Sequence, residues 1–268
     1  MNSYCHLKDR TIISIRGKDK FAFLQSMITN DLSFLEHKPV IYTLFLSPTG
    51  RFLYDAFIIN YNDSYLLDVN AENSTKFIQR LNLYKLKSNL EIEDQTAFFD
   101  ILYLKNNFES ELCYKDPRYW KLGYRYISPK NTRPGDLNEN LYYEDKYEYC
   151  IPDGFIDYIQ DRTLPPEYDF EKLFAVSYTK GCYIGQEVIS RAKYQGIIRK
   201  KLYKLIFDQE VSNLFGQEIL QNGMKVGIIT SSWKNFSISL LRIELLNLDS
   251  YVEVGVVKGK ILEVEWNR

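Results

Sequence analysis

One segment, Ser177 to Arg191, concentrates residue types that could do chemistry, and its sequence is SYTKGCYIGQEVISR. Its cysteine, Cys182, lies close to two glycines, Gly181 and Gly185. Good helix formers follow Gly185, so the pattern predicts a helix that starts there and leaves Cys182 just before its N-terminus. Free backbone N–H groups at that end, together with the nearby ammonium of Lys180, favour a thiolate over a thiol. From the local sequence alone, Cys182 is either a reactive thiolate or a small cysteine packed in a tight turn.

The helix predicted after Gly185 carries a stabilising pair of its own. Glu187 and Arg191 are four residues apart, in the favourable order for an ion pair. The two glycines, Gly181 and Gly185, predict either a positive φ or the close approach of another backbone, because a Cβ would prevent both. Substitution of either glycine is therefore expected to disturb the Cys182 loop.

The cysteines and histidines do not form a metal-binding or disulfide pattern. The four cysteines stand at positions 5, 113, 150 and 182, with no C-x-x-C spacing, which argues against a disulfide scaffold and against a self-contained zinc or iron-sulfur site. The two histidines, His6 and His37, are far from Cys182 in sequence. The first 15 residues have neither a signal-peptide nor a transit-peptide pattern. These features together favour a reducing cytoplasm.

Composition and charge exclude several classes of protein. The chain has 268 residues, 45% of them hydrophobic and 26% charged, which is typical of a folded globular protein of one large or two small domains. A net charge of −1 provides no global field that would attract nucleic acid or membrane. The longest stretch without a charged residue, Pro39 to Gly50, is far too short to span a membrane. Any basic site must therefore be local.

One local basic site is present. Arg191 to Lys204 contains six basic residues, two tyrosines and no acid. Such a patch could bind the phosphates of a nucleic acid. It could equally be a solvated strand edge that its lysines protect from pairing.

Hydrophobic patterning predicts the elements that position these residues. The expected strands of the first half are Thr11 to Arg16, Val40 to Leu46, Phe52 to Ile59, Tyr65 to Val69, Leu90 to Glu93 and Ala97 to Leu104. Helices are expected over Lys20 to Ile28 and over Ala71 to Leu86. The turn Ser47-Pro-Thr-Gly50 joins two of the strands into a hairpin. Mixed strands and helices without a strict βαβ rhythm predict an α+β fold.

Two further regions differ from this pattern. Asp116 to Asp153 is rich in tyrosine, asparagine, proline and acids, and predicts an irregular, surface-exposed region. Beyond Gly196, short strands alternate with turn signals such as Asn222-Gly223, which predicts a small antiparallel barrel or sandwich.

The eight residues Lys180 to Glu187, KGCYIGQE, resemble the full signature of the YgfZ family, the folate-binding proteins of iron-sulfur cluster assembly and repair. Other segments match the family in content and order: Phe23-Leu24-Gln25 with Thr29-Asn30-Asp31, Leu46 to Arg51 with Asp55, Asp116-Pro117-Arg118 with Leu122-Gly123, and Leu164-Pro-Pro-Glu167. The resemblance implies the fold of glycine-cleavage T-protein relatives. That fold has two α+β, ferredoxin-like modules around a central folate-binding opening, and a C-terminal small antiparallel β-barrel.

The resemblance also implies domain limits. The first module is expected at residues 1–95, with a first strand that could belong to the next module. The second, which carries the KGCYIGQE motif, is expected at 96–198, and the barrel at 199–268.

The function implied by the resemblance is that of a folate-binding accessory factor for assembly, transfer or repair of iron-sulfur clusters in client enzymes, rather than a classical enzyme. The expected cofactor is tetrahydrofolate or another reduced folate. The expected partners are iron-sulfur carrier or client proteins. Cys182 would ligate iron transiently, accept sulfur or act by redox chemistry, with Lys180 beside it. Because clusters usually need four thiolate ligands, a partner must supply the others.

The resemblance further assigns residues to folate. Glu167 falls where relatives place a carboxylate on the pterin, although it could instead cap a helix over Glu171 to Val176. Tyr183 and Gln186 are assigned to the same site. Asp55 and Arg51 either contact folate or pair with each other.

Two alternatives remain open. The first is a folate-dependent aminomethyltransferase or demethylase on the same fold. Tyr54 argues against it, because true aminomethyltransferases commonly carry a second acid beside the position of Asp55. The second is a tRNA-interacting protein, active in tRNA modification, that uses the basic patch of Arg191 to Lys204; the same patch could instead hold the carboxylates of a polyglutamylated folate.

Overall fold

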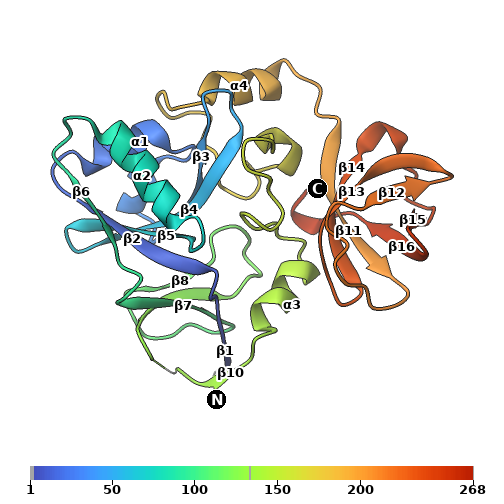
Figure 1. Cartoon of the computed structure of the whole chain (residues 1–268), viewed down its shortest axis with the longest axis horizontal. Coiled ribbons are helices and arrows are strands. Elements are labelled where there is room, and N and C mark those ends of the chain that lie inside the picture. Colours follow the sequence, from blue (N-terminus) through green and yellow to red (C-terminus); the bar gives the residue numbers. More distant parts are fainter. Residues whose placement is uncertain (1–2, 133, 268) are drawn as a thin grey trace.

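Two five-stranded sheets, a closed six-stranded barrel and a few helices make up the computed structural model, which describes residues 3–132 and 134–267. The two sheets lie at one end of the long axis and the barrel lies at the other, with helix α3 between them (Figure 1). The predicted α+β class and the predicted C-terminal antiparallel barrel are confirmed. The predicted domain limits at residues 95/96 and 198/199 stay predictions.

The first sheet is antiparallel, with the strand order β3-β4-β5-β2-β6. Its strands are β2 (Arg10–Arg16), β3 (Ile41–Leu46), β4 (Phe52–Tyr61), β5 (Ser64–Asn70) and β6 (Glu91–Asp94). Helices α1 (Lys20–Met27) and α2 (Ser74–Lys85) join it in one hydrophobic cluster. Another cluster joins β3 and β4 to the second sheet. Burial on both faces explains why β3 and β4 are nearly continuous apolar and aromatic runs.

The second sheet has the strand order β10-β1-β7-β9-β8. Its strands are β1 (Ser3–His6), β7 (Phe99–Leu104), β8 (Cys113–Lys115), β9 (Tyr124–Pro129) and β10 (Asp136–Leu137). β1 pairs in parallel with β10, and the other pairs are antiparallel. The short helix α3 (Leu141–Glu148) packs on this sheet. The first strand of the chain thus belongs to the second sheet.

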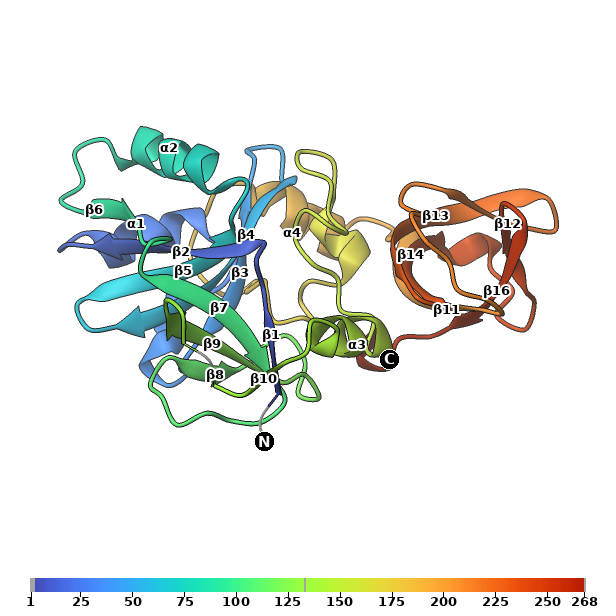
Figure 2. The same ribbon diagram turned by 60° about the horizontal axis from the view of Figure 1, so that its bottom comes forward.

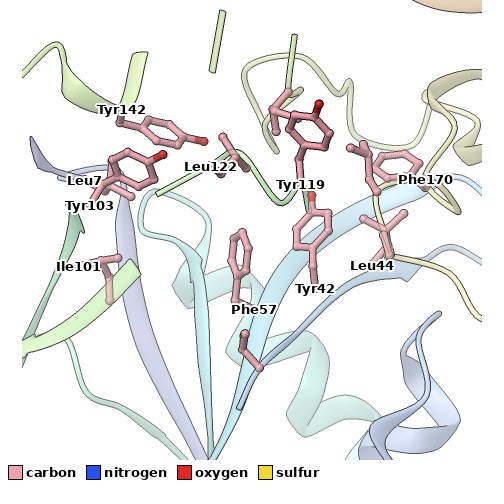
Figure 3. Close-up of a cluster of buried hydrophobic side chains, with 14 of the residues drawn as sticks. Leu7, Tyr42, Leu44, Phe57, Ile101, Tyr103, Tyr119, Leu122, Tyr142 and Phe170 are labelled. Atoms are coloured by element: carbon pink, nitrogen blue, oxygen red, sulfur yellow. The ribbon is translucent and has the colours of Figure 1, made fainter. Parts of the chain in front are cut away.

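Aromatic side chains fill the space between the sheets. Figure 3 shows Tyr42 and Phe57 of the first sheet pointing toward a layer that includes Tyr119 and Leu122. The rings of Tyr42 and Phe57 lie 4.8 Å apart. Aromatic residues bury a large apolar area each, so this layer is a major contributor to the hydrophobic stabilisation of the fold.

The barrel is closed by pairing of its first strand with its last, in the order β11-β14-β13-β12-β15-β16. Its strands are β11 (Lys200–Phe207), β12 (Glu218–Gln221), β13 (Met224–Trp233), β14 (Phe236–Arg242), β15 (Val252–Val254) and β16 (Val257–Leu262). Its interior is a separate apolar cluster. Figure 2 shows the ring of strands set apart from the two sheets.

The linking segment, residues 149–185, runs between the sheets and the barrel with little regular structure (Figure 1). It contains one short 3-10 helix, η2 (Pro165–Tyr168), and leads to helix α4 (Gln186–Tyr194). Three more 3-10 turns lie elsewhere, at Leu32–Glu36, Ile243–Leu245 and Glu265–Asn267. None of the helices in the described ranges is long and apolar enough to cross a membrane.

Two predictions about local structure are wrong. Asp116 to Asp153 is not a surface-exposed, irregular region, because it contributes β9, α3 and the fully buried side chains of Arg118 and Lys146. Glu171 to Val176 is not a helix. Phe174 has a φ of +55°, and a left-handed residue of this kind interrupts a right-handed helix.

Candidate functional site

Cys182 lies on an exposed loop directly before α4. It is the exposed cysteine of the chain, whereas Cys5 and Cys150 are buried and Cys113 is half-buried. Burial raises the pKa of the Cys5, Cys113 and Cys150 thiols. A buried thiol is a poor nucleophile and a poor metal ligand, so Cys182 is the cysteine with the access that such chemistry needs.

Gly185 has the conformation that its sequence context predicted. It is the N-cap of α4, with a φ of +83°. A Cβ placed on it would lie 2.6 Å from the carbonyl oxygen of Ser47 and 3.1 Å from Cα of Gly50. The tight packing of α4 against the β3–β4 turn therefore needs glycine at this position.

The corresponding prediction for Gly181 is wrong. Gly181 is exposed, its φ is outside the left-handed region, and no described atom lies within 4 Å of the position of its Cβ. Its position in open space leaves room for a side chain. The constraint that fixes the Cys182 loop comes from other residues.

Lys180 makes contacts that the sequence did not indicate, and its effect on the Cys182 thiol stays a prediction. Its side chain is buried, with an exposed fraction of 7%. Nζ donates to the carbonyl oxygens of Gln25, Ile28 and Asn30 at 2.7, 2.8 and 2.8 Å. These three bonds use all three ammonium donors. Desolvation by burial lowers the pKa of Lys180 to about 8, against the opposing charge of Asp31.

The segment before Lys180 is hydrogen-bonded to the stretch of chain that the Lys180 ammonium contacts, residues 25–30. Asn30 Nδ2 donates to the Phe174 carbonyl at 2.7 Å, and Thr29 Oγ1 donates to the Ala175 carbonyl at 2.7 Å. The backbone N–H of Ser177 donates to the Thr29 carbonyl at 2.9 Å. The Thr29-Asn30-Asp31 segment and the KGCYIGQE segment, noted separately in the sequence, are thus one hydrogen-bonded unit.

Tyr183 and Gln186 lie on either side of Gly185. Tyr183 is buried, and its ring centroid lies 5.0 Å from Nζ of Lys180. Burial raises the pKa of its phenol, and its hydroxyl has no hydrogen-bond partner among the described residues. The backbone N–H of Gln186 donates to the Tyr183 carbonyl at 3.2 Å. One turn further on, Arg191 forms the expected exposed ion pair with Glu187 at 2.6 Å.

Glu167 lies on η2, beside the barrel. Its carboxylate is 3.4 Å from Nζ of Lys200 and is partly accessible to solvent. The alternative role as cap of a helix over residues 171–176 is excluded, since that helix does not form.

Asp55 is buried in the interior of the fold. It accepts hydrogen bonds from Arg10 at 3.3 Å and from the hydroxyl of Tyr42 at 3.2 Å. The predicted pairing with Arg51 is wrong, because Arg51 donates to the Arg162 carbonyl instead. With no exposed surface, Asp55 is not a free acid or base at an open site.

Asp55 is part of a larger group that the sequence analysis missed, called here the buried charge cluster. Its members share burial and mutual ion pairs: Arg10, Asp55, Asp68, Asp116, Arg118, Arg125, Lys146, Asp153 and Asp157. Burial opposes ionisation of Asp153, but Lys146 and Arg118 outweigh it and hold the pKa of that carboxyl well below its usual range. The signal that could have revealed the cluster is a charged residue in mid-strand within an apolar run, as at Asp68 and Arg125.

Two hollows share part of their lining and are therefore neighbours. The first, about 270 Å³, has apolar walls that include Val40, Tyr42 and Phe174, and is also lined by Lys38 and Lys115. The second, about 370 Å³, shares Phe174 and Lys38 with the first and extends to Thr179, three residues before Cys182. Among the described residues, neither Glu167 nor Asp55 lines either hollow.

Phe174 lines both hollows. Its side chain is 60% exposed, although its backbone has a left-handed conformation that is unfavourable for a bulky residue. The bond from Asn30 to its carbonyl holds it there. Strained residues held in this way cluster at ligand sites.

The basic patch of Arg191 to Lys204 is largely neutralised. Besides the Glu187–Arg191 pair, four of its lysines lie within 4.0 Å of a carboxylate: Lys193 with Glu171, Lys200 with Glu167, Lys201 with Asp169 and Lys204 with Glu148. Five of its six charges are therefore paired, which leaves little net charge to attract phosphates. Within the described ranges, no group of three or more His, Cys, Asp or Glu residues is arranged to hold a metal ion.

Known proteins resemble this chain in sequence. Residues 6–105 match the family model of the GCVT N-terminal domain. The chain is 27% identical over 267 residues to the mitochondrial iron-sulfur cluster assembly factor IBA57 homolog of Dictyostelium discoideum, covering 80% of this chain and 65% of that protein. It is also 27% identical over 234 residues to the mitochondrial iron-sulfur cluster assembly factor IBA57 of Homo sapiens, covering 75% of this chain and 65% of that protein.

The chain is thus similar in sequence to proteins named as iron-sulfur cluster assembly factors. It spans slightly less than two thirds of the length of these two relatives. Its fold matches that of a solved enzyme, the glycine cleavage system aminomethyltransferase T from Bartonella henselae, with a TM-score of 0.79 at 12% sequence identity. The match covers 99% of this chain and 86% of that chain. The chain therefore has the aminomethyltransferase fold.

Proposed function

We propose that this chain is an accessory factor for the assembly or repair of iron-sulfur clusters, and that it presents the thiol of Cys182 to a partner that carries the cluster. The observation that carries the proposal is the similarity to cluster assembly factors over 80% of the chain. The full match of Lys180 to Glu187 to the KGCYIGQE signature supports placement in the YgfZ family.

The chemistry of Cys182 agrees with this role. It is exposed, and its loop is fixed at Lys180 and at the start of α4. A single cysteine provides one of the four thiolates that a cluster usually needs. The partner would supply the remaining ligands, so the complex is a transient, shared site rather than a resident cluster.

A reduced folate such as tetrahydrofolate is the proposed cofactor, and the first hollow fits its chemistry. Val40, Tyr42 and Phe174 offer apolar and aromatic walls for a flat ring system. The ammonium groups of Lys38 and Lys115, which also line the hollow, suit the carboxylates of a glutamate tail. Glu167 does not line this hollow, so a contact between Glu167 and the pterin is a different placement of the folate, which the Glu167 variant tests.

The four cysteines are free thiols, which supports a reducing compartment for this chemistry. The names of the relatives place those proteins in mitochondria, whereas the sequence expectation for this chain is the cytoplasm. Imaging of a tagged full-length chain distinguishes the two.

The experiment that tests the function is complementation. A strain that lacks its own assembly factor of this kind receives the chain, and the activity of a cluster-dependent dehydratase is measured against an empty vector. Restored activity at equal dehydratase abundance supports the proposal. Unrestored activity with the chain present and folded would refute it.

Titration calorimetry with tetrahydrofolate tests the cofactor separately. Lys115→Met should weaken binding, and Lys87→Met, a lysine remote from the hollow in sequence and absent from its lining, is the control. Equal affinity in the two variants would remove Lys115 from the site.

A further inference from the structure

Helix α1 ends with backbone carbonyls that have no partner within the helix, as every helix does. The partners come from the two sides of Cys182. Lys180 Nζ donates to the Gln25 carbonyl at 2.7 Å, and the Ile184 backbone N–H donates to the Ser26 carbonyl at 3.2 Å. The loop that carries the cysteine therefore also caps the C-terminus of α1.

The ammonium suits this position for two reasons. The C-terminus of a helix carries a partial negative charge, which favours a cation. The same ammonium also reaches the carbonyls of Ile28 and Asn30, just beyond the helix. A neutral side chain could not satisfy three carbonyls from one atom.

We infer that Lys180 is a positioning residue: its ammonium caps α1 and thereby fixes the Cys182 loop, instead of acting on the thiol. This inference deepens the proposed function, since it explains how a loop with an unhindered Gly181 can present a cysteine in one place. It also gives the Phe23–Asp31 and KGCYIGQE segments, some 150 residues apart, a common structural role, because the contacts between them fix the Cys182 loop.

The test compares Lys180→Met with Lys180→Arg in the full-length chain, and Lys204→Met is the control. Lys204 is as buried as Lys180, at 7% exposed, and it donates to the Glu148 carbonyl at 3.0 Å and to its carboxylate at 2.8 Å. Two rates are measured: amide hydrogen exchange over residues 177–186, and alkylation of Cys182 by iodoacetamide, resolved by mass spectrometry.

If Lys180 positions the loop, both Lys180 variants exchange the hydrogen-bonded amides of this segment, those of Ser177, Ile184 and Gln186, at least about tenfold faster than wild type, since several charge-assisted bonds are lost or misplaced. Alkylation of Cys182 is then as fast as in wild type or faster. Lys204→Met changes neither rate. Should Lys180→Met prove unfolded, Lys180→Gln, which is neutral but retains a donor, provides the same comparison.

The opposite outcome overturns the inference. If the ammonium acts on the thiol, Lys180→Met slows alkylation several-fold, Lys180→Arg keeps the wild-type rate, and exchange stays unchanged in both. Neither rate involves a cluster. Failure of complementation by the wild-type chain would therefore refute the proposed function but not this inference. Unchanged amide exchange in the Lys180 variants would refute this inference but not the proposed function.

Discussion

Asp68 offers the sharpest test of how the two sheets are held together. It lies on β5 with no exposed surface. It accepts from Arg10 Nε at 2.7 Å and from Arg125 Nε and Nη2 at 3.0 and 2.6 Å. Arg125 belongs to β9, so this one carboxylate joins the first sheet to the second.

The substitution Asp68→Asn keeps the shape and removes the charge. Arg10 then retains Asp55 at 3.3 Å, and Arg125 retains Asp116 at 3.8 Å, so two buried guanidinium groups lose their shortest ion pair. Removing one partner of a buried ion pair typically costs about 3–5 kcal/mol, well above the roughly 0.5–1.5 kcal/mol of a neutral hydrogen bond. We therefore expect Asp68→Asn to lower the unfolding free energy by about 3–5 kcal/mol.

Urea unfolding followed by far-ultraviolet circular dichroism measures this loss, because urea, unlike guanidinium, does not screen charges. Asp63→Asn is the control: Asp63 pairs with Lys20 at 2.7 Å, but its side chain is fully exposed, so no measurable change is expected. A loss below about 1 kcal/mol for Asp68→Asn would show that the cluster is screened like a surface pair, and the account of the buried charge cluster would be wrong.

Three further predictions concern the site. Gly185→Val should displace α4 from the β3–β4 turn and lower the melting temperature and the activity in complementation, whereas Gly181→Ala should match wild type in both; equal behaviour of the two variants would contradict the geometry. Glu167→Ala should weaken tetrahydrofolate binding by about 1.5–3 kcal/mol, as expected for a charged hydrogen bond, and unchanged affinity by calorimetry in a folded variant would remove Glu167 from the site. The pKa of Lys180 is lowered to about 8 by burial, against about 10.4 in the unfolded chain, so between these values the unfolded state binds more protons. The unfolding free energy of wild type relative to Lys180→Met should therefore rise as pH increases through that window, and a flat or falling difference in urea titrations at several pH values would show that Lys180 is not desolvated.

Local sequence patterns correctly predicted the elements whose structure is decided by residues adjacent in sequence. The hairpin around Ser47 to Gly50 follows from its turn residues, and the start of α4 follows from Gly185 and the helix formers after it. The barrel follows from short strands separated by turn signals. In each case the deciding residues are neighbours in sequence.

The remaining features depend on partners distant in sequence. Asp68 and Arg125 are 57 residues apart, and Lys180 binds carbonyls about 150 residues away. Nothing local indicates that Asp116 to Asp153 folds inward, because its acids and tyrosines look like surface residues until their arginine and lysine partners are known. The helix expected over Glu171 to Val176 is likewise interrupted at Phe174, whose carbonyl accepts a hydrogen bond from the distant side chain of Asn30.

The proposed function depends on the thiol of Cys182, and two matched substitutions in the complementation assay test this dependence. Cys182→Ser removes the exposed thiol, and Cys113→Ser removes the half-buried one. With both variants at wild-type abundance and melting temperature, we predict that Cys113→Ser restores the cluster-dependent dehydratase and that Cys182→Ser does not. Full restoration by Cys182→Ser would contradict this prediction and show that the thiol is dispensable.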